Sequence, residues 1–385
     1  MQTIESALVP VARGTYLDEP LRVVHLLDTS DRDIPAWGKE RAVEALMRVQ
    51  RESGQVNPEL VCFAWSQFAA DLSADGFPVL ILHEGRARAP HAAIAKLKRI
   101  LGAGSVPVVH THSHKANVLG RATRIVGARM QRLIASYHGW DQQVVRRGLL
   151  NRMDRSSSRL SDAITVPDAA MARLFGPDVR VIHLAQTIAY TPLPTDDERA
   201  ESRAAYGFAP DDFVVGTFGR LNEMTGALEL LAAARGSQAR GITWAIAGSG
   251  ELAGSFQISG LKNVRMLGEI EHPASFFAAI DVYVQAAHRE NLGPSLLAAM
   301  RAGIPSVATR VGVTDIAARH DVEALIIEPG DSEDMLQRIA FLKRSPLVRR
   351  RLGASARTRF DTAFDIRFAH ETLLDLYRYG GMKRV

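Results

Sequence analysis

Residues 290–315, ENLGPSLLAAMRAGIPSVATRVGVTD, carry the features that decide the fold. Pro294 opens an apolar helical segment that ends at Gly303, and the run IPSVAT that follows has the composition of a buried strand. A glycine turn comes next, at Gly312. A helix N-terminus presents unpaired backbone N–H groups, and Glu290 stands just ahead of this one. The stretch therefore predicts a site for a polyhydroxylated, phosphate-bearing ligand at one edge of a sheet.

The bulk composition predicts a water-soluble protein of two domains. A chain of 385 residues is longer than one hydrophobic core usually supports. The 46% hydrophobic and 23% charged fractions are ordinary for a globular protein. The N-terminus does not resemble a signal peptide, and no transmembrane helix is expected. Cys62 is the single cysteine, so a disulfide within the chain is excluded, and we expect a cytoplasmic location.

Positive charge is concentrated in the first half of the chain. Residues 110–159 contain ten Lys and Arg but only two Asp. The basic residues are Lys115, Arg121, Arg124, Arg129, Arg132, Arg146, Arg147, Arg152, Arg155 and Arg159. They predict either a surface for an anionic lipid or acceptor, at the inner face of the plasma membrane, or simply solvated helix faces. A nucleic-acid partner is not expected, because no aromatic interleaving or binding motif accompanies the charges.

Short apolar runs alternate with helical segments along the first half of the chain. The first strand is expected at 21–28 and the first helix at 39–52, where apolar residues recur with a period of about 3.6. Further strands are predicted at 59–65, 78–83, 107–112, 133–138, 162–167 and 179–185, with helices at 92–101 and 116–126. This alternation is typical of a parallel sheet covered by helices on both faces.

The alternation repeats in the second half. A proline-containing linker is predicted at 186–198, and a second series of strands and helices runs from 213 to 342. The last segment, 366–379, is amphipathic and could pack back on the first domain. The fold class predicted is α/β, with two Rossmann-like, doubly wound parallel-sheet domains facing across a cleft. The expected division is an extension at 1–20, domains at 21–190 and 191–365, and a final helix at 366–385.

Two residues follow predicted strands directly, where ligands bind in such sheets. Arg220 comes after a strand at 213–219, and its guanidinium fork suits phosphate oxygens. The alternative for Arg220 is a surface ion pair. His138 and Gly139 follow the strand at 133–137, and this histidine can bond a ligand hydroxyl or carry a proton. The alternative for His138 is a partly buried structural role.

A glycine-rich turn follows the predicted strand at 243–248. Gly248, Gly250 and Gly254 have the spacing G-x-G-x-x-x-G, which departs from the dinucleotide fingerprint G-x-G-x-x-G. Glu269 stands near where an acidic residue would hold a ribose, so a nicotinamide enzyme stays open as an alternative. A turn that lets a ligand approach the backbone is the interpretation that we favour.

Two further patterns suggest metals but are short. His110, His112 and His114 alternate, so on a strand they would share a face, and H-x-H can bind zinc. No further ligand cluster at a recognisable spacing completes such a site, and we predict none. Asp31 and Asp33 form a D-x-D pair, but their place straight after the first strand argues against a metal-dependent transferase.

Together these pieces resemble the family 4 retaining glycosyltransferases of the GT-B type, most strongly at 213–330. The resemblance implies transfer of a sugar from a nucleotide-sugar donor, without a metal or other cofactor and with retention of the anomeric configuration. A glycan or lipid-linked acceptor in cell-envelope or exopolysaccharide synthesis is then expected.

The resemblance also assigns residues. It implies that His138 and Glu290 contact the transferred sugar and that Arg220 binds the diphosphate, so these three are the expected catalytic residues. The implied donor-binding residues are Gly38, Arg220, Thr225, Gly248, Ile270, Glu290, Asn291, Leu292 and Gly293.

Two positions depart from the family pattern. Thr225 stands where a lysine is expected, and Ala298 stands where a second glutamate normally receives the ribose hydroxyls. Each charged hydrogen bond contributes about 1.5–3 kcal/mol, so donor affinity is expected to fall by about 10²–10⁴-fold if nothing substitutes. A non-catalytic homologue that acts as a partner subunit is therefore the main alternative. A sugar-nucleotide epimerase of the same fold is a further one.

Overall fold

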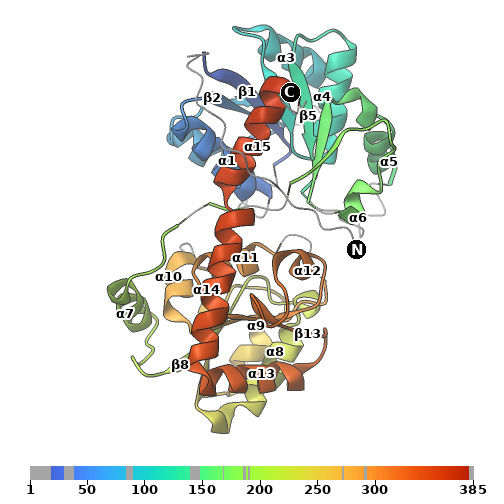
Figure 1. Ribbon diagram of the computed structural model, residues 1–385. Helices are drawn as coiled ribbons and strands as arrows, with labels where there is room; N and C mark the ends of the chain where they lie inside the picture. Colours follow the sequence, from blue (N-terminus) through green and yellow to red (C-terminus); the bar gives the residue numbers. More distant parts are fainter. Residues whose placement is uncertain are drawn as a thin grey trace.

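The computed structural model describes residues 19–29, 39–83, 90–138, 148–167, 169–184, 188–189, 191–270, 273–289 and 293–380. The chain forms two lobes, each built on one sheet with helices against it (Figure 1). The strand pairs within the two sheets are parallel. The predicted α/β class, with two doubly wound parallel sheets, is therefore confirmed.

The first lobe contains a seven-stranded sheet of order β3-β2-β1-β4-β5-β6-β7. Its strands are β1 (Leu21–Leu27), β2 (Val56–Cys62), β3 (Val79–Ile81), β4 (Val108–Thr111), β5 (Arg132–Ser136), β6 (Ala163–Val166) and β7 (Val181–His183). Its helices are α1 (Lys39–Glu52), α2 (Gln67–Ala74), α3 (Pro90–Gly102), α4 (His114–Ile125), α5 (Gly148–Ser156), η2 (Ser158–Leu160) and α6 (Ala169–Ala172). The strand order reverses between β1 and β4, and sheets of this kind bind ligands at the carboxyl ends of the strands beside such a reversal.

The second lobe contains a six-stranded sheet of order β10-β9-β8-β11-β12-β13. Its strands are β8 (Phe213–Phe218), β9 (Ile242–Ala247), β10 (Val264–Gly268), β11 (Val282–Gln285), β12 (Ser306–Thr309) and β13 (Ala324–Ile327). The helices are α7 (Asp196–Ala205), η3 (Glu223–Thr225), α8 (Ala227–Gly236), η4 (Gln238–Arg240), α9 (Ala253–Gln257), α10 (Pro273–Ala279), α11 (Pro294–Arg301), α12 (Val313–Ala317), α13 (Ser332–Arg344) and α14 (Pro346–Ala363). Here the order reverses between β8 and β11.

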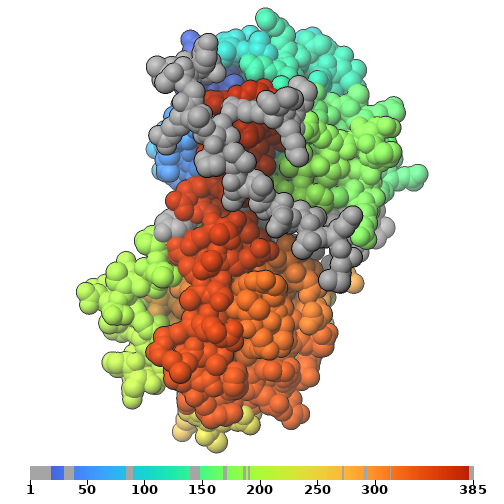
Figure 2. All heavy atoms as spheres, viewed as in Figure 1, coloured from blue at the N-terminus to red at the C-terminus, as the bar shows by residue number. Residues whose placement is uncertain are grey.

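The last helix, α15 (Ile366–Tyr379), lies against the first lobe although it follows α14 of the second (Figure 1). One face of the first sheet supplies Val23, Val108 and Ile134 to an apolar cluster that Leu46 of α1 and Leu373 of α15 complete. The opposite face packs against α3 and α4. Figure 2 shows α14 and α15 as one red band that runs across both lobes. The end of the chain thus ties the two lobes together.

Where the elements differ from the predictions, local chemistry explains the difference. β2 begins at Val56, earlier than predicted, and tolerates Pro58 because its pairing with β3 starts only at Leu60. The predicted linker overlaps the start of α7, because Thr195 and Glu198 form a capping box there. Helices α2, α5 and α14 were not predicted, whereas α1 and α15 have the predicted bounds.

Candidate active site

His138 lies at the carboxyl edge of the first sheet, two residues beyond the end of β5. Its side chain is half-buried, and its Nε2 is 3.1 Å from Nδ1 of His112. Burial, together with the positive charge of Lys39, lowers the pKa of His138 to about 4. The imidazole is therefore neutral near pH 7, and a neutral ring can accept a hydrogen bond from a hydroxyl. Gly139, its neighbour in the predicted motif, lies outside the described residues.

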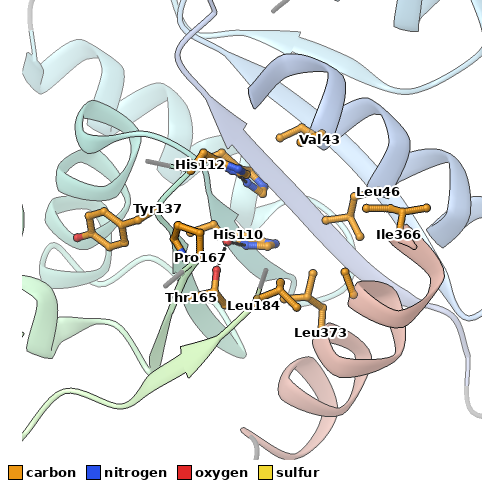
Figure 3. Close-up of a pocket in the computed structure, with 14 residues that line it drawn as sticks. Val43, Leu46, His110, His112, Tyr137, Thr165, Pro167, Leu184, Ile366 and Leu373 are labelled. Atoms are coloured by element: carbon orange, nitrogen blue, oxygen red, sulfur yellow. Dashed lines mark hydrogen bonds between the residues drawn. The ribbon is translucent and has the colours of Figure 1, made fainter. Parts of the chain in front are cut away.

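A small cavity lies beside His138 (Figure 3). Its volume is about 50 Å³, and its polar lining includes His110, His112 and Thr165. In Figure 3 His110 and His112 lie on the sheet side, and Leu373 of α15 lies on the helix side. A cavity of this size holds a few water molecules but no sugar. It is therefore too small to be the substrate site itself.

Three buried imidazoles, those of His25, His110 and His112, lie close together, and the last two line this cavity. Each offers a nitrogen within 4.8 Å of the others, which is a possible arrangement for a metal ion. His25 was not predicted as a member of this cluster, because it comes from β1 and is distant from the H-x-H pattern along the chain. His114 does not join the cluster, since its Nδ1 pairs with Oδ2 of Asp154 at 2.6 Å. The absence of a metal stays a prediction.

In the second lobe, Arg220 lies two residues beyond the end of β8 and its side chain is exposed. Within the described part of the chain its guanidinium has no hydrogen-bond or ion-pair partner. The alternative of a surface ion pair therefore finds no partner among those residues. A free guanidinium at the carboxyl edge of a parallel sheet is available to an anionic ligand.

Thr225 shapes the loop that carries Arg220. Its hydroxyl donates to the carbonyl oxygen of Arg220 at 2.6 Å and accepts from the backbone N–H of Asn222 at 3.1 Å. Asn222 in turn caps the backbone N–H of Thr225. In this structure the hydroxyl of Thr225 therefore makes its hydrogen bonds within the loop itself.

The loop after β11 packs directly on this loop. The backbone N–H of His288 donates to the carbonyl of Met224 at 2.9 Å. A Cβ at Gly226 would overlap the carbonyl oxygen of Ala286, so only glycine permits this approach. The residues that lead to position 290 therefore adjoin the loop of Arg220, although Glu290, Asn291 and Leu292 themselves lie outside the described residues, as does Gly38.

Helix α11 begins next to these residues. Gly293 is its N-cap in the left-handed conformation, with φ 52°, and Pro294 occupies the first turn. Ala298 lies on the buried side of this helix, in an apolar cluster with residues such as Phe276. The position at which a second glutamate was expected is therefore part of the core here.

Glycines bring the loops after β8 and β9 together. A Cβ at Gly248 would overlap the carbonyl oxygen of Gly219, and one at Gly250 would overlap the backbone of Leu221. The close approach is thus between two loops of the protein, whereas the sequence suggested a ligand. The following helix α9 has only five residues. Ile270, a predicted donor contact, is half-buried just beyond β10.

The basic stretch of the first lobe is partly structural. Arg121 is buried and pairs with Asp154 at 2.6 Å, and Arg124 pairs with Asp162 at 2.8 Å. Arg132 donates to two carbonyl oxygens of α15. Among the described basic residues of the stretch, four are exposed, namely Lys115, Arg129, Arg152 and Arg159. The described helices include none that is long and apolar enough to cross a bilayer.

Comparisons with known proteins agree with this geometry. The family model "Glycosyltransferase Family 4" matches residues 38–184, and "Glycosyl transferases group 1" matches residues 198–359. The chain is 26% identical over 176 residues to the capsular polysaccharide biosynthesis glycosyltransferase CapM of Staphylococcus aureus. It is 29% identical over 121 residues to the lipopolysaccharide core biosynthesis glycosyltransferase LpsD of Rhizobium meliloti. These alignments cover 43% and 31% of the chain, and less than half of either relative, 46% and 35%.

The solved structure of Anabaena Alr3699/HepE in complex with UDP shares the whole architecture. The TM-score is 0.78 at 18% identity, and the match covers 92% of this chain and 99% of that one. Such low identity supports the fold alone. Since the two family models together match most of both lobes, the chain belongs to the family 4 glycosyltransferases, with the two-lobed GT-B fold.

Proposed function

We propose that this protein transfers a sugar, in the manner of a hexosyltransferase, from a nucleotide-sugar donor to a glycan or lipid-linked acceptor of the cell envelope or exopolysaccharide. The transfer retains the anomeric configuration and needs no metal. The observation that carries the proposal is the exposed guanidinium of Arg220, which has no partner among the described residues, at the switch point of the second sheet. The UDP complex of the structurally similar Alr3699/HepE and the envelope roles in the names of CapM and LpsD support this choice.

The chemistry of such a transfer matches the residues of the crevice. When a nucleoside diphosphate leaves, negative charge develops on its β-phosphate. Arg220 and the N-terminus of α11 beside Gly293 would stabilise this charge where it forms. The sugar becomes positively charged in the same step, and Glu290 and the neutral His138 would orient its hydroxyls. No residue is assigned as a covalent nucleophile.

The test is a thermal-shift screen against nucleoside diphosphates and nucleotide sugars. A ligand at about 100 times its Kd adds about 2.7 kcal/mol to the free energy of unfolding, which gives a clear shift. We expect stabilisation by UDP or GDP, and a loss of roughly 10–100-fold in affinity in Arg220→Ala. Arg235→Ala removes an exposed arginine of α8 and should bind like the wild type. Equal binding by both variants would contradict the role of Arg220.

A partner subunit without turnover is the second candidate, because Thr225 and Ala298 replace two charged donor contacts. Such a protein would bind nucleotide weakly or not at all and would release no nucleoside diphosphate. A nicotinamide enzyme is less well supported, since the spacing of Gly248, Gly250 and Gly254 departs from the dinucleotide fingerprint and the first two pack against the loop after β8. Stabilisation by NAD alone would revive it.

A lipid-linked acceptor would bring the protein to the inner face of the plasma membrane. Helix α5 exposes Leu149 (73%) and Met153 (47%), and the exposed arginines Arg152 and Arg159 lie on α5 and the adjoining η2. Apolar side chains flanked by arginine suit an anionic membrane surface. Sedimentation with vesicles of anionic lipid should pellet the protein, and the double variant Leu149→Ser, Met153→Ser should remain in solution. Equal sedimentation of both proteins would contradict this surface.

A further inference from the structure

A band of polar side chains crosses the first sheet on its otherwise apolar face. His25, His110, Ser136 and Thr165 come from four adjacent strands, β1, β4, β5 and β6, and all are buried. They lie toward the carboxyl ends of the strands, where the face covered by α1 and α15 reaches the crevice. Buried polar groups need hydrogen-bond partners, so each of these side chains is expected to bond to another group of the protein.

One arm of hydrogen bonds runs from helix α1 to the crevice. Nε2 of His25 is 2.8 Å from Oε1 of Gln50, and Nδ1 of His25 is 2.9 Å from Nε2 of His112. Nδ1 of His112 is then 3.1 Å from Nε2 of His138. Two imidazoles, those of His25 and His112, thus connect the buried amide of Gln50 to His138.

A second arm starts from the same amide. Nε2 of Gln50 donates to Oη of Tyr377 on α15 at 3.3 Å, and Oη is 2.6 Å from Nδ1 of His110. Nε2 of His110 is 2.6 Å from Oγ of Ser136, which is 2.5 Å from Oγ1 of Thr165. Gln50 is therefore the branch point of the whole network.

The histidines in this network are neutral. Burial lowers the pKa of His25 to about 4 and holds the pKa values of His110 and His112 well below 6.5. A neutral imidazole has one N–H and one acceptor nitrogen, so every bond in an arm must run in the same direction. The donor and acceptor in the bond that starts an arm then determine the donor and acceptor in every following bond of that arm.

The orientation of the Gln50 amide sets this direction. Its Oε1 accepts from Nε2–H of His25, so Nδ1 of His25 must accept from Nε2–H of His112, and Nδ1 of His112 from Nε2–H of His138. In the second arm Tyr377 donates to His110, which also becomes the Nε2–H form. A reversed amide would place all four hydrogens on Nδ1. The Nε2–H form is also the intrinsically favoured tautomer of neutral imidazole.

A metal ion fits this cluster less well than hydrogens do. Two nitrogens bound to zinc at about 2.0–2.1 Å in tetrahedral geometry lie about 3.3 Å apart. The nitrogens of His25 and His112 are 2.9 Å apart, and both nitrogens of His110 already contact hydroxyl groups. Bound zinc would have to break several of these bonds.

We propose that Gln50 is a positioning residue for His138: through His25 and His112 it holds His138 in the Nε2–H form. Nδ1 of His138 is then left as a hydrogen-bond acceptor for a sugar or acceptor hydroxyl. The functional half of this inference rests on the proposed glycosyl transfer, whereas the tautomer is a property of the folded chain alone. Gln50 and His25 touch no substrate and act only through this chain of bonds.

Nitrogen-15 NMR of the histidine-labelled protein tests the tautomer directly. Long-range couplings show which ring nitrogen carries the hydrogen, and His138→Gln identifies the signal of His138 by removing it. We expect Nε2–H for His138 and for the three buried histidines. A hydrogen on Nδ1 of His138, a mixture of forms, or one zinc ion bound per chain in elemental analysis would overturn the proposal.

A pair of variants tests the function of the hydrogen-bond chain that joins Gln50 to His138. Gln50→Leu removes the amide, so His138 should show both tautomers, and kcat should fall by roughly 10–100-fold with a smaller change in the KM of the donor. Gln337→Leu changes an exposed glutamine of α13 and should leave kcat, KM and the spectrum unchanged. If Gln50→Leu does not fold, Gln50→Met replaces it.

The outcomes separate this inference from the proposed function. One outcome is that no donor is turned over, while His138 is a single Nε2–H tautomer in the wild type and a mixture of tautomers in Gln50→Leu. This outcome would support the positioning role of Gln50 and contradict the proposed glycosyl transfer. If donor is turned over and Gln50→Leu keeps the wild-type kcat, the positioning role fails although the transfer stands.

Discussion

At the scale of single residues, Thr225 and Arg220 share one loop but have different tasks. The hydroxyl of Thr225 both donates and accepts within the loop, at 2.6 Å to Arg220 and at 3.1 Å from Asn222. A lysine at position 225 could not do this, because an ammonium group only donates. The hydroxyl of Thr225 thus holds the backbone of this loop in place.

Removing this hydroxyl should loosen the loop. Thr225→Val loses two hydrogen bonds of a capping arrangement, so we expect the free energy of unfolding to fall by about 1–2 kcal/mol. Urea unfolding measures the change. Thr358→Val, at an exposed position of α14, serves as the control and should unfold like the wild type. A Thr225→Val protein as stable as this control would contradict the structural role of the hydroxyl.

The residues nearest the strand ends were predictable, whereas their partners were not. Arg220 and His138 stand out in the sequence because each follows an apolar strand directly. Their surroundings depend on contacts that join distant segments: His25 and His112 are 87 positions apart, and Gln50 and Tyr377 are 327 apart. A histidine within the apolar run 21–27 was the only local sign that polar chemistry reaches this strand.

At the scale of elements, the loops after β8 and β9 form one unit through their glycines. Gly248 has φ 127°, and a Cβ there would overlap the carbonyl oxygen of Gly219. We expect Gly248→Ala to lower the free energy of unfolding by more than about 2 kcal/mol, because the strained conformation and the overlap act together.

Gly254→Ala is a matched control for this prediction. Gly254 lies in α9 with open space around its Cα, so alanine should be neutral or slightly stabilising there. Chemical unfolding of both variants measures the difference. Similar stabilities of Gly248→Ala and Gly254→Ala would show that the two loops are not packed as described.

Helices and strands were predicted correctly where burial gives a clear pattern of apolar residues in the sequence. Buried parallel strands are short apolar runs, and amphipathic helices such as α1 and α15 show one apolar face. Helix α14 escaped prediction because its sequence, PLVRRRLGASARTRFDTA, places arginine, glycine and alanine among few large apolar residues. Its buried face is narrow and includes Gly353 and Arg357, which no periodicity of apolar residues reveals.

At the scale of the whole molecule, α15 joins the end of the chain to the first sheet. Leu373 is 2% exposed and packs with Val23 and Val108 of that sheet. Leu373→Ala should lower the free energy of unfolding by about 2–5 kcal/mol through the cavity that it leaves. Phe368→Ala, on the same helix at 53% exposure, should change it by less than about 0.5 kcal/mol. Comparable effects of both variants would contradict the packing of α15.

The buried histidines make stability depend on pH. In the unfolded chain each takes up a proton near its ordinary pKa of 6.5, whereas folded His25 stays neutral down to about pH 4. The unfolded state therefore binds more protons in this range. The free energy of unfolding should fall as pH decreases from about 6.5 toward 4, by about 1.4 kcal/mol per pH unit for each such histidine.

Urea titrations at about pH 7, 6 and 5 measure this slope. His112→Gln removes one of the neutral buried histidines, so its stability should depend less steeply on pH than that of the wild type. His91→Gln, at an exposed position of α3, should keep the wild-type slope. An unchanged slope in His112→Gln would contradict a neutral buried imidazole at this position.

The most direct test of the account is release of a nucleoside diphosphate from a nucleotide sugar. Wild-type protein is incubated with UDP- and GDP-sugars and an envelope lipid and glycan extract, beside Arg220→Ala and Arg235→Ala. The account predicts release that depends on the extract, slower by about 10²-fold in Arg220→Ala and unchanged in Arg235→Ala. Binding of nucleotide by the wild type without any release would contradict glycosyl transfer and leave a partner subunit as the function.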